Sequence, residues 1–465
     1  MIGSRIVQLN IHLSKVQFNF YHQTSMASLL VPPTSIRGKN SLDYEAFNIT
    51  LKNIPCVVLA DQYLRQFINK LRPFFLKFRS FKSVQSLETI DGQYIVYLDP
   101  RKIKNVTDVL KKEILWNKLY KEVELKLSYI NWQPHEVLNA ILPEDIEVPT
   151  SFSQVGHIIH LNLRNEQLPY KNVIGQVYLD KIPNVKTVVN KVNIIDNVYR
   201  NFAMEILAGE QNTMVSVKEN GCIYHFDFSK VYWNPRLGTE HFALVNFMKK
   251  GDVLYDIFAG VGPFAVPSAR KGIRVLANDL NPESYKWLVK NAQVNKVTDL
   301  LMAFNKDGRE FLKVDVKKDI VERREKNDNG SEHIVMNLPA LAVEFLDVFE
   351  NWLSSEEIDK VCLNPPVVHV YCFIKASKSD DFYALAKLYI EKKLGYNLPS
   401  ESLLNIHQVR NIASNKEMMR VSFLLTKNML KEEPAMKKLK HVNDNDDDNF
   451  LGNNGEEQEQ DKECI

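Results

Sequence analysis

The chain has 465 residues, of which 45% are hydrophobic and 25% charged, a composition typical of a folded protein with more than one domain. No apolar run approaches the roughly 18 residues of a membrane-spanning helix, so we expect no contact with a membrane. The five cysteines include no C-x-x-C pair, and the 11 histidines include no H-x-x-x-H. These observations argue against a disulfide framework and against a bound metal.

The charge is distributed unevenly along the chain. Residues 1–42 contain no Asp or Glu, whereas the segment from Asp444 to the end holds nine acidic residues and one lysine, Lys462. Without that acidic tail the chain is clearly basic, with a net charge of roughly +10. A basic protein body suits a polyanionic partner.

The first 42 residues have the composition of a mitochondrial transit peptide. They lack acids, carry Arg5 and Lys15, and mix apolar residues with Ser, Gln and Asn. A merely disordered leader is the alternative interpretation. Met26 offers a second start without the leader. We therefore expect the protein in the mitochondrial matrix and, in the shorter form, also in the cytoplasm and nucleus.

Residues 43–150 alternate helical and strand patterns and indicate a first α+β domain, with a helix over 106–123. Within it, residues 65–82 hold six basic side chains, five phenylalanines and no acid. Most of these phenylalanines are expected in the core, which would leave a basic outer face.

Residues 151–235 indicate a small strand-rich α+β domain with one helix near 200–208. Asn220-Gly221, between two alternating apolar runs, predicts a β-hairpin. Residues 236–430 then alternate buried strands with helices, which predicts an α/β fold with an open, doubly wound, Rossmann-like sheet. The charged run 313–333 is expected to be a surface loop, and 431–465 a disordered acidic tail.

The stretch "YDIFAGVGPFAV" (255–266) is a ligand-binding loop with two possible interpretations. Gly260 and Gly262 allow a tight turn from strand to helix, as in the G-x-G-x-x-A fingerprint of a nicotinamide oxidoreductase. However, Asp256 would repel the pyrophosphate of that cofactor. S-adenosyl-L-methionine carries a positive sulfonium and an ammonium group, which a carboxylate attracts. The loop therefore favours S-adenosyl-L-methionine.

Acidic residues also follow the next two predicted strands. Asp279 in "LANDLNP" suits ribose hydroxyls, and Asp307 in "NKDGREF" suits the adenine amino group. Ordinary turn residues are the alternative for any one of these acids. Acids at three successive strand ends favour a nucleotide-like ligand.

Asn337 follows the fourth predicted strand in "MNLPAL", an N-x-P that resembles the N/D-P-P motif of methyltransferases acting on amino groups. Its amide would hold a planar nitrogenous ring against the methyl donor. Asn364 in "LNPPVV" matches the motif more closely, but it stands directly before the fifth strand. We therefore favour Asn337 and interpret the second motif as a loop leading into that strand.

Seven ordered motifs resemble the archaeal and eukaryotic tRNA (guanine-N1)-methyltransferases, which act on nucleotide 37, just 3′ of the anticodon. The resemblance is strong over about 150–430 and looser over 43–150, and it implies that 43–150 recognises tRNA. The motifs are "VGHIIHLNLRNEQLPYKNVIGQVYLDK", "KTVVNKV", "YRNFAMEILAGE", "KVYWNPRLGTEH", "YDIFAGVGPFAV", "ANDLNPES" and "MNLPALAVEFL".

The resemblance also implies roles for individual residues. Guanine N1 must lose a proton to attack the methyl group, and negative charge then develops on O6. Glu240 would be the general base, Arg200 would stabilise O6, and Asn337 would orient the guanine and touch the donor. A helix-terminal acid paired with Arg236 is the alternative for Glu240. By the same resemblance the donor pocket would be lined by His241, Asp279, Leu280, Asp307 and Gly308.

Three other functions stay open at this point. The related aminocarboxypropyl transferase of the wybutosine pathway uses the same donor, although "NLP" and "RLGTEH" favour the methyltransferase. A nicotinamide oxidoreductase is disfavoured by Asp256. A non-catalytic tRNA-binding protein would be expected to lack Arg200, Glu240 and Asn337. The main expectation is a monomeric enzyme that flips guanine-37 out of the anticodon loop of tRNA.

Overall fold

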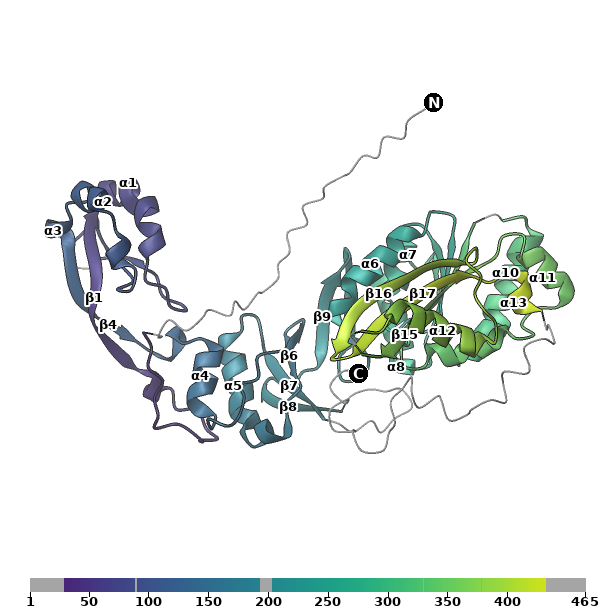
Figure 1. Ribbon diagram of the computed structural model, residues 1–465, viewed down its shortest axis with the longest axis horizontal. Helices are drawn as coiled ribbons and strands as arrows, with labels where there is room; N and C mark the ends of the chain where they lie inside the picture. The colour runs from purple at the N-terminus through teal and green to yellow at the C-terminus, as the bar shows by residue number, and fades with distance from the viewer. Residues whose placement is uncertain (1–28, 88–89, 193–202, 329, 378, 432–465) are drawn as a thin grey trace, which may run out of the picture. The chain divides into compact units, whose positions relative to one another are not determined.

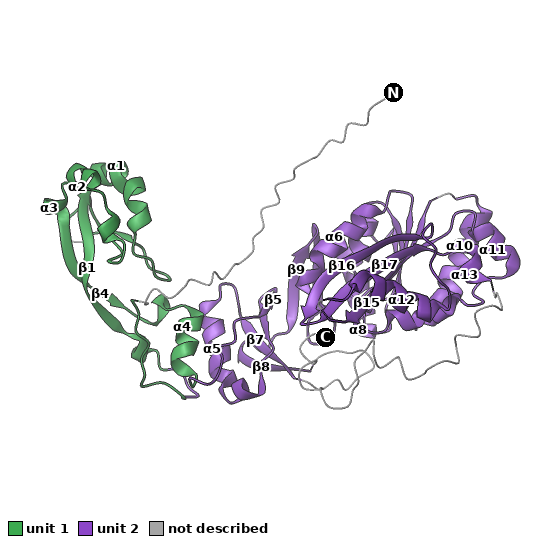
Figure 2. Cartoon of the chain, in the orientation of Figure 1, with its two compact units in different colours: residues 1–38, 43–143 green, residues 39–42, 144–465 purple. Residues whose placement is uncertain are grey.

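The computed structural model describes residues 29–87, 90–192, 203–328, 330–377 and 379–431. The chain forms two compact units, shown in Figure 2: residues 1–38 with 43–143, and residues 39–42 with 144–465. The predictions for 1–28 and for 432–465, which cover most of the leader and tail, lie outside the described residues. The predicted domain limits at 150 and 235 fall inside the second unit.

Unit 1 contains an antiparallel sheet in the order β2-β3-β1-β4. The apolar run of β1 and the inner face of α1 close a core around Val57, Leu59, Phe67 and Leu71. The elements are β1 (Ile49–Ala60), α1 (Asp61–Leu71), β2 (Val84–Ser86), β3 (Gln93–Tyr97), α2 (Asp108–Glu113), α3 (Trp116–Leu119), β4 (Tyr120–Leu127) and α4 (Pro134–Ile141).

The single helix predicted over 106–123 is wrong. Leu115 takes a left-handed backbone with φ of 51°, which separates α2 from α3, because an α-helix needs negative φ throughout. Tyr120 then begins β4, which pairs with β1. Pairing with a neighbouring strand has overridden the local helical pattern.

The basic segment 65–82 has the predicted arrangement. Phe67 is buried in the core and Phe74 and Phe75 pack against it, so most of these rings contribute to the core, whereas Phe78 and Phe81 are partly buried outside it. Of the cations only Arg79 is partly buried, and the rest are exposed. The segment thus presents a basic outer face.

Unit 2 begins with a sheet in the order β5-β6-β7-β8, against which α5 packs. The helix predicted near 200–208 is wrong, because Ala203–Gly209 forms β8, antiparallel to β7. A Cβ on Gly175 of α5 would lie 2.6 Å from the Leu207 Cβ, so this glycine lets helix and strand approach closely. The elements are β5 (Ser153–Val155), β6 (Ile158–Leu161), α5 (Lys171–Lys181), β7 (Thr187–Val192) and β8 (Ala203–Gly209).

The hairpin predicted at Asn220-Gly221 is confirmed. It joins β9 (Met214–Glu219) to β10 (Cys222–Asp227), and both turn residues have positive φ, 49° and 77°, as a type I′ turn requires. Asn291 Oδ1 accepts a hydrogen bond from the His225 backbone at 2.8 Å. The hairpin therefore packs on α8 (Pro282–Val294), although the predicted limit at 235 separates the two.

The large sheet of unit 2 has the order β13-β12-β11-β14-β15-β17-β16. Strands β11 to β15 are parallel, and β17 is antiparallel to both β15 and β16. This confirms the Rossmann-like, doubly wound prediction. Its elements are α6 (Gly238–Phe247), β11 (Val253–Asp256), α7 (Ala265–Arg270), β12 (Arg274–Asn278), α8, β13 (Leu301–Phe304), α9 (Gly308–Phe311), α10 (Lys317–Glu325), β14 (Glu332–Met336), α11 (Ser355–Val361), β15 (Val367–Lys375), α12 (Phe382–Leu394), β16 (Leu403–Ala413), β17 (Lys416–Leu424) and α13 (Lys427–Leu430).

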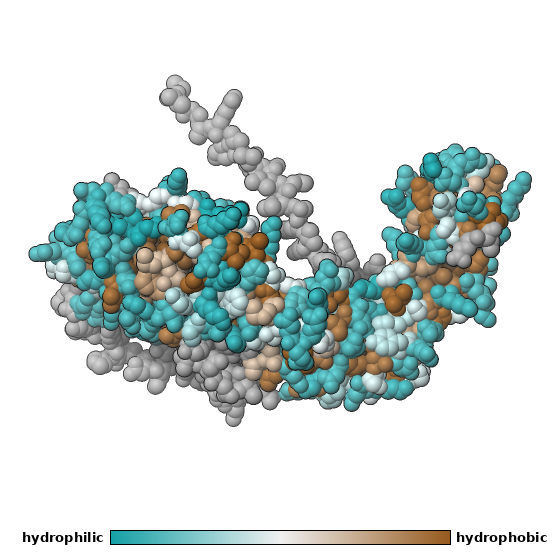
Figure 3. All heavy atoms as spheres, turned by 180° about the vertical axis from the view of Figure 1, so that it is seen from behind, coloured by the Kyte–Doolittle hydropathy of each residue, from teal (hydrophilic) through white to brown (hydrophobic). Residues whose placement is uncertain are grey.

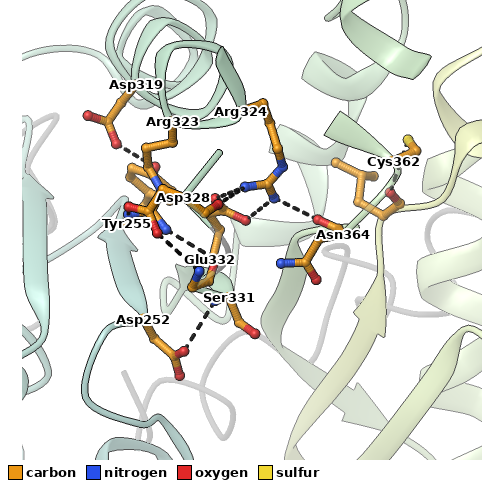
Figure 4. A network of polar contacts seen from close by, with 12 residues as sticks. Asp252, Tyr255, Asp319, Arg323, Arg324, Asp328, Ser331, Glu332, Cys362 and Asn364 are labelled. Carbon is orange, nitrogen blue, oxygen red and sulfur yellow. Dashed lines mark hydrogen bonds and ion pairs between the residues drawn. The ribbon is translucent and has the colours of Figure 1, made fainter. Parts of the chain in front are cut away.

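The surface loop predicted over 313–333 is wrong. A π-helical turn, Leu312–Val316, leads into α10, whose Ile320 is fully buried in the core. Figure 4 shows why so charged a segment folds: the buried Glu332 carboxylate accepts from Arg323 Nε at 3.0 Å and from an Arg324 nitrogen at 2.7 Å. Charges paired in this way can be buried. The network lies at the start of β14, at the opposite end of that strand from Asn337.

The second proline motif precedes a strand as predicted. Pro365 and Pro366 stand between α11 and β15, and the backbone oxygen of Asn364 accepts from Arg324 at 2.7 Å. "LNPPVV" is therefore the entry to β15, which leaves Asn337 as the candidate after β14.

Hydrophilic residues cover most of the face shown in Figure 3, where the hydrophobic groups are small and separated. Within the described ranges, no helix is long and apolar enough to cross a membrane. In the same ranges, no group of three or more His, Cys, Asp or Glu side chains is placed to hold a metal ion.

Candidate active site

The polar residues predicted at successive strand ends meet at one edge of the large sheet. Asp256, the last residue of β11, is in register with Ala277 of β12 and with Val335 of β14. Asp279 comes two residues after Ala277, and Asn337 comes two residues after Val335. All three polar residues therefore lie at the carboxyl ends of adjacent parallel strands. This edge is where open α/β sheets bind ligands.

The glycine loop is tied to the neighbouring strand end. Gly260 N donates to Asp279 Oδ2 at 2.8 Å, and Ala259 N donates to the Asn278 oxygen at 2.8 Å. Gly262 has φ of 100°, and a Cβ there would lie 2.8 Å from both the Leu288 and the Val266 side chains. Glycine is thus required at 262 by conformation and by space.

Asp279 combines partial burial with several hydrogen bonds. Oδ1 accepts from Asn281 N at 2.9 Å, and Oδ2 from Gly260 N. Burial raises the pKa of Asp279 to about 6, although these hydrogen bonds act in the opposite direction. The carboxylate is therefore mostly ionised at pH 7.

Asp256 and Asn337 have polar atoms that the protein leaves unmatched. Asp256 is fully buried, and neither carboxylate oxygen has a hydrogen-bond partner of normal geometry. Burial, with repulsion from Asp279, raises the pKa of Asp256 well above its ordinary value, which the Phe258 backbone N–H offsets only partly. Asn337 Oδ1 is also buried without a partner.

These acceptors fit a ligand that brings donors or positive charge. The ammonium, sulfonium and ribose hydroxyls of S-adenosylmethionine supply these, whereas a pyrophosphate would bring negative charge and no hydrogen-bond donors to these acceptors. The donor set of this edge therefore fits S-adenosylmethionine and not a nicotinamide dinucleotide.

The residues predicted at the adenine end lie after β12 and β13. Asp307 is exposed and caps α9, accepting from Arg309 N at 2.8 Å. Gly308 is buried, and a Cβ there would lie 3.0 Å from the Phe345 ring and 3.1 Å from that of Phe258. Leu280 is 42% exposed.

Glu240 lies in the first turn of α6 and is only 6% exposed. Tyr371 OH donates to its Oε1 at 2.7 Å, and Arg420 Nη1 lies 2.8 Å from the same oxygen, as an ion pair without hydrogen-bond alignment. His407 Nε2 lies 3.4 Å from Oε2. The alternative partner, Arg236, forms no ion pair with Glu240 in the part of the chain that the structure describes.

Tyr371 connects Glu240 to the ligand edge. Met336 is in register with Val370, so Asn337, directly after β14, and Tyr371, in the middle of β15, lie at the same level of the sheet. The Phe264 ring of the glycine loop is centred 6.0 Å from the Tyr371 ring. Base candidate and donor loop thus belong to one packed cluster.

His241, next to Glu240, packs against the same loop. Its ring is centred 4.7 Å from Phe264, and its Nδ1 lies 2.7 Å from Glu219 Oε1. The predicted place of His241 in the donor pocket remains a prediction. Arg200, predicted to stabilise O6, lies outside the described residues.

The sequence analysis missed the partners of Glu240. Tyr371 and Arg420 stand in strands β15 and β17, far from Glu240 along the chain, and no motif marks them. The one available signal was Arg420 itself, a charged residue in the apolar run "MMRVSFLL". A buried strand cation requires a buried anion.

Comparisons with known proteins identify the family of this chain. A family model described as the TRM5/TYW2 methyltransferase domain matches residues 215–358, and one described as the TYW2 N-terminal domain matches 135–213. A Xenopus tropicalis protein named tRNA (guanine(37)-N(1))-methyltransferase is 46% identical over 411 residues, 86% of this chain and 81% of that protein. A Drosophila melanogaster protein of the same name is 42% identical over 437 residues, covering 92% and 94%.

Solved structures share the fold. The complex of aTrm5 with tRNALeu matches with a TM-score of 0.58 and 25% identity, over 80% of this chain and 99% of that one. Trm5b from Pyrococcus abyssi matches with a TM-score of 0.54 and 22% identity over the same shares, which supports the fold alone. With relatives this similar over most of both chains, the protein belongs to the tRNA (guanine(37)-N(1))-methyltransferase family.

Proposed function

We propose that this chain methylates N1 of guanine-37 in tRNA with S-adenosylmethionine as donor, Glu240 as general base and Arg200 stabilising O6. The observation that carries the proposal is the buried Glu240 carboxylate, tied through Tyr371 to the sheet edge that fits the donor. Family membership indicates the reaction, N1-methylation of guanine, and the nucleotide that is methylated, position 37 of tRNA.

The edge residues would hold the donor, which supplies an electrophilic methyl group on sulfur. Asp256 would face its positive charge, Asp279 would accept from the ribose hydroxyls, and Gly260 and Gly262 would let the backbone approach. Leu280, Asp307 and Gly308 would surround the adenine, and His241 would support the loop from behind. Asn337, with its unmatched Oδ1, would contact both guanine and donor.

The two oxygens of Glu240 would have different tasks. Oε1 is occupied by Tyr371 and Arg420, whose positive charge stabilises the ionised carboxylate. Among the described residues the partner of Oε2 is His407, 3.4 Å away, whose side chain is 46% exposed, so Oε2 is the oxygen on the side that leads to solvent. Oε2 would therefore take the N1 proton, while Oε1 holds the carboxylate in place.

Substrate position and reaction type are tested together. The purified chain is given tRNA with guanine or adenine at position 37 and donor labelled in the methyl group or in the methionine carboxyl. We expect only methyl label, only on guanine-37, recovered as 1-methylguanosine by mass spectrometry of nucleosides. Carboxyl label in the RNA would indicate aminocarboxypropyl transfer instead, and equal labelling of both tRNAs would sink the proposal.

Replacing Glu240 tests the base. Glu240→Gln should lower the single-turnover rate by about 100-fold or more, because proton removal by a positioned base contributes on that order. The residual rate should lose the wild-type dependence on pH. Tyr371→Phe should cost less, since Arg420 still holds Oε1. Glu322→Gln, a partly exposed acid of α10, is the matched control and should react as the wild type. An unchanged rate in Glu240→Gln would remove this residue from the mechanism.

Asp279 makes donor binding depend on pH. Its pKa of about 6 lies above the ordinary 3.8, so the ligand-free protein is destabilised as pH rises through about 6 and the buried group ionises. The ionised carboxylate is the better acceptor for ribose hydroxyls. Calorimetric affinity for S-adenosylhomocysteine should therefore rise across the same range. Asp279→Asn should flatten the pH dependence of both the stability and the affinity. Asp299→Asn, an exposed acid just before β13, should leave both dependences unchanged. A curve that persists in Asp279→Asn would assign the titration elsewhere.

We also propose that residues 1–42 direct part of the protein to the mitochondrial matrix, with cytoplasmic and nuclear protein starting at Met26. Support comes from the acid-free, cationic composition, since residues 1–28 lie outside the described ranges. Residues 1–25 fused to a fluorescent protein should give mitochondrial signal. The same fusion with Arg5→Glu and Lys15→Glu should be diffuse. A diffuse signal from the unaltered fusion contradicts targeting.

A further inference from the structure

A row of polar side chains crosses the large sheet on the face that α6 covers. Tyr371 of β15 is in register with Arg420 of β17, and Arg420 is in register with His407 of β16. Residues directly opposite each other in neighbouring strands project from the same face of a sheet. These three side chains therefore lie side by side, and each of them contacts the Glu240 carboxylate. Asn337, directly after β14, lies at the same level.

His407 is the outermost member of this row. β16 is the last strand of the sheet, and the His407 side chain is 46% exposed, whereas that of Glu240 is 6% exposed. His407 Nε2 lies 3.4 Å from Glu240 Oε2, the oxygen that Tyr371 and Arg420 leave to it. Contacts between acids and bases are often this long before substrate binds and shorten in the complex. His407 thus stands between a buried carboxylate oxygen and solvent.

The proposed reaction needs an exit for a proton. Methyl transfer to guanine N1 releases a proton in each turnover, and Glu240 must lose that proton before it can act again. Arg420 already carries its full number of protons, and burial raises the pKa of Tyr371 well above its ordinary value, so its hydroxyl also stays protonated. His241 is directed elsewhere, with Nδ1 2.7 Å from Glu219 Oε1. A histidine beside Oε2 can accept a proton on one ring nitrogen and release one from the other near neutral pH.

We infer that His407 passes the proton of guanine N1 from Glu240 to solvent. The inference rests on the proposed function, in which the N1–H bond breaks and an Oε2–H bond forms as the methyl group is transferred. The Oε2–H bond then breaks and an Nε2–H bond forms, so the imidazole becomes a cation and Glu240 a carboxylate again. Loss of the Nδ1 proton to water makes the ring neutral, and proton exchange with water restores the tautomer that accepts at Nε2. Each methyl group transferred thus delivers one proton to solvent.

Proton release during a single turnover tests the inference. The full chain with bound donor is mixed with a smaller amount of tRNA carrying guanine-37, in weakly buffered solution with a pH indicator, and quenched samples are analysed for 1-methylguanosine. In the wild type both signals should advance together. In His407→Gln methyl transfer should continue, because Glu240 can still take the first proton. Proton release should then lag by on the order of 100-fold, the contribution of a positioned proton acceptor.

Two further variants separate proton transfer from other roles of the side chain. His407→Lys keeps a positive charge near Oε2 but cannot accept a proton at pH 7, because an ammonium group ordinarily has a pKa of about 10.4. It should lag as His407→Gln does. His225→Gln removes a partly exposed histidine of the β9–β10 hairpin and is the control, in which proton release should stay in step with methyl transfer.

The possible outcomes are distinct. Proton release that keeps pace with methyl transfer at the wild-type rate in His407→Gln would overturn the inference. A lag in His407→Gln but not in His407→Lys would also overturn it, since a positive charge alone would then suffice. If both steps slow equally, the rate of methyl transfer with added imidazole decides: restoration supports the relay, and an unrestored rate assigns His407 a structural role.

The same samples separate this inference from the proposed function. A wild-type chain that forms no 1-methylguanosine contradicts the proposed function, and the relay falls with it. A wild-type chain that forms 1-methylguanosine, while neither His407 variant shows a lag or a slower rate, contradicts the relay alone.

Discussion

The candidate active site depends on one buried contact, the Glu240 carboxylate held by Tyr371 and Arg420. The three residues come from α6, β15 and β17, which the sequence separates widely. A carboxylate 6% exposed is stable only if opposite charge and hydrogen bonds match it. The contact therefore fixes α6 against the half of the sheet that follows β14, and with it places Glu240 beside the edge at which Asp256, Asp279 and Asn337 lie.

The donor edge has the opposite character, because folding leaves its acceptors unmatched. Asp256 is fully buried with no aligned hydrogen bond, and Asn337 Oδ1 has none. Such groups lower the stability of the ligand-free protein. A positively charged ligand with several hydrogen-bond donors would recover that loss on binding. The polar groups around Glu240, in contrast, are matched within the protein, which holds this carboxylate in one position. Buried polar atoms without hydrogen-bond partners are expected at functional sites.

Sequence reasoning succeeded where position in the fold follows from local order. The strand-to-helix rhythm, the glycine loop and the acids at strand ends all depend on residues close together in the chain, and the parallel sheet brings them to one edge. It failed where pairing across long separations decides the outcome. Leu115 and β4, strand β8 and the buried Arg323–Glu332 pair each follow from tertiary partners that composition does not reveal. The Tyr371 and Arg420 contacts belong to the same class.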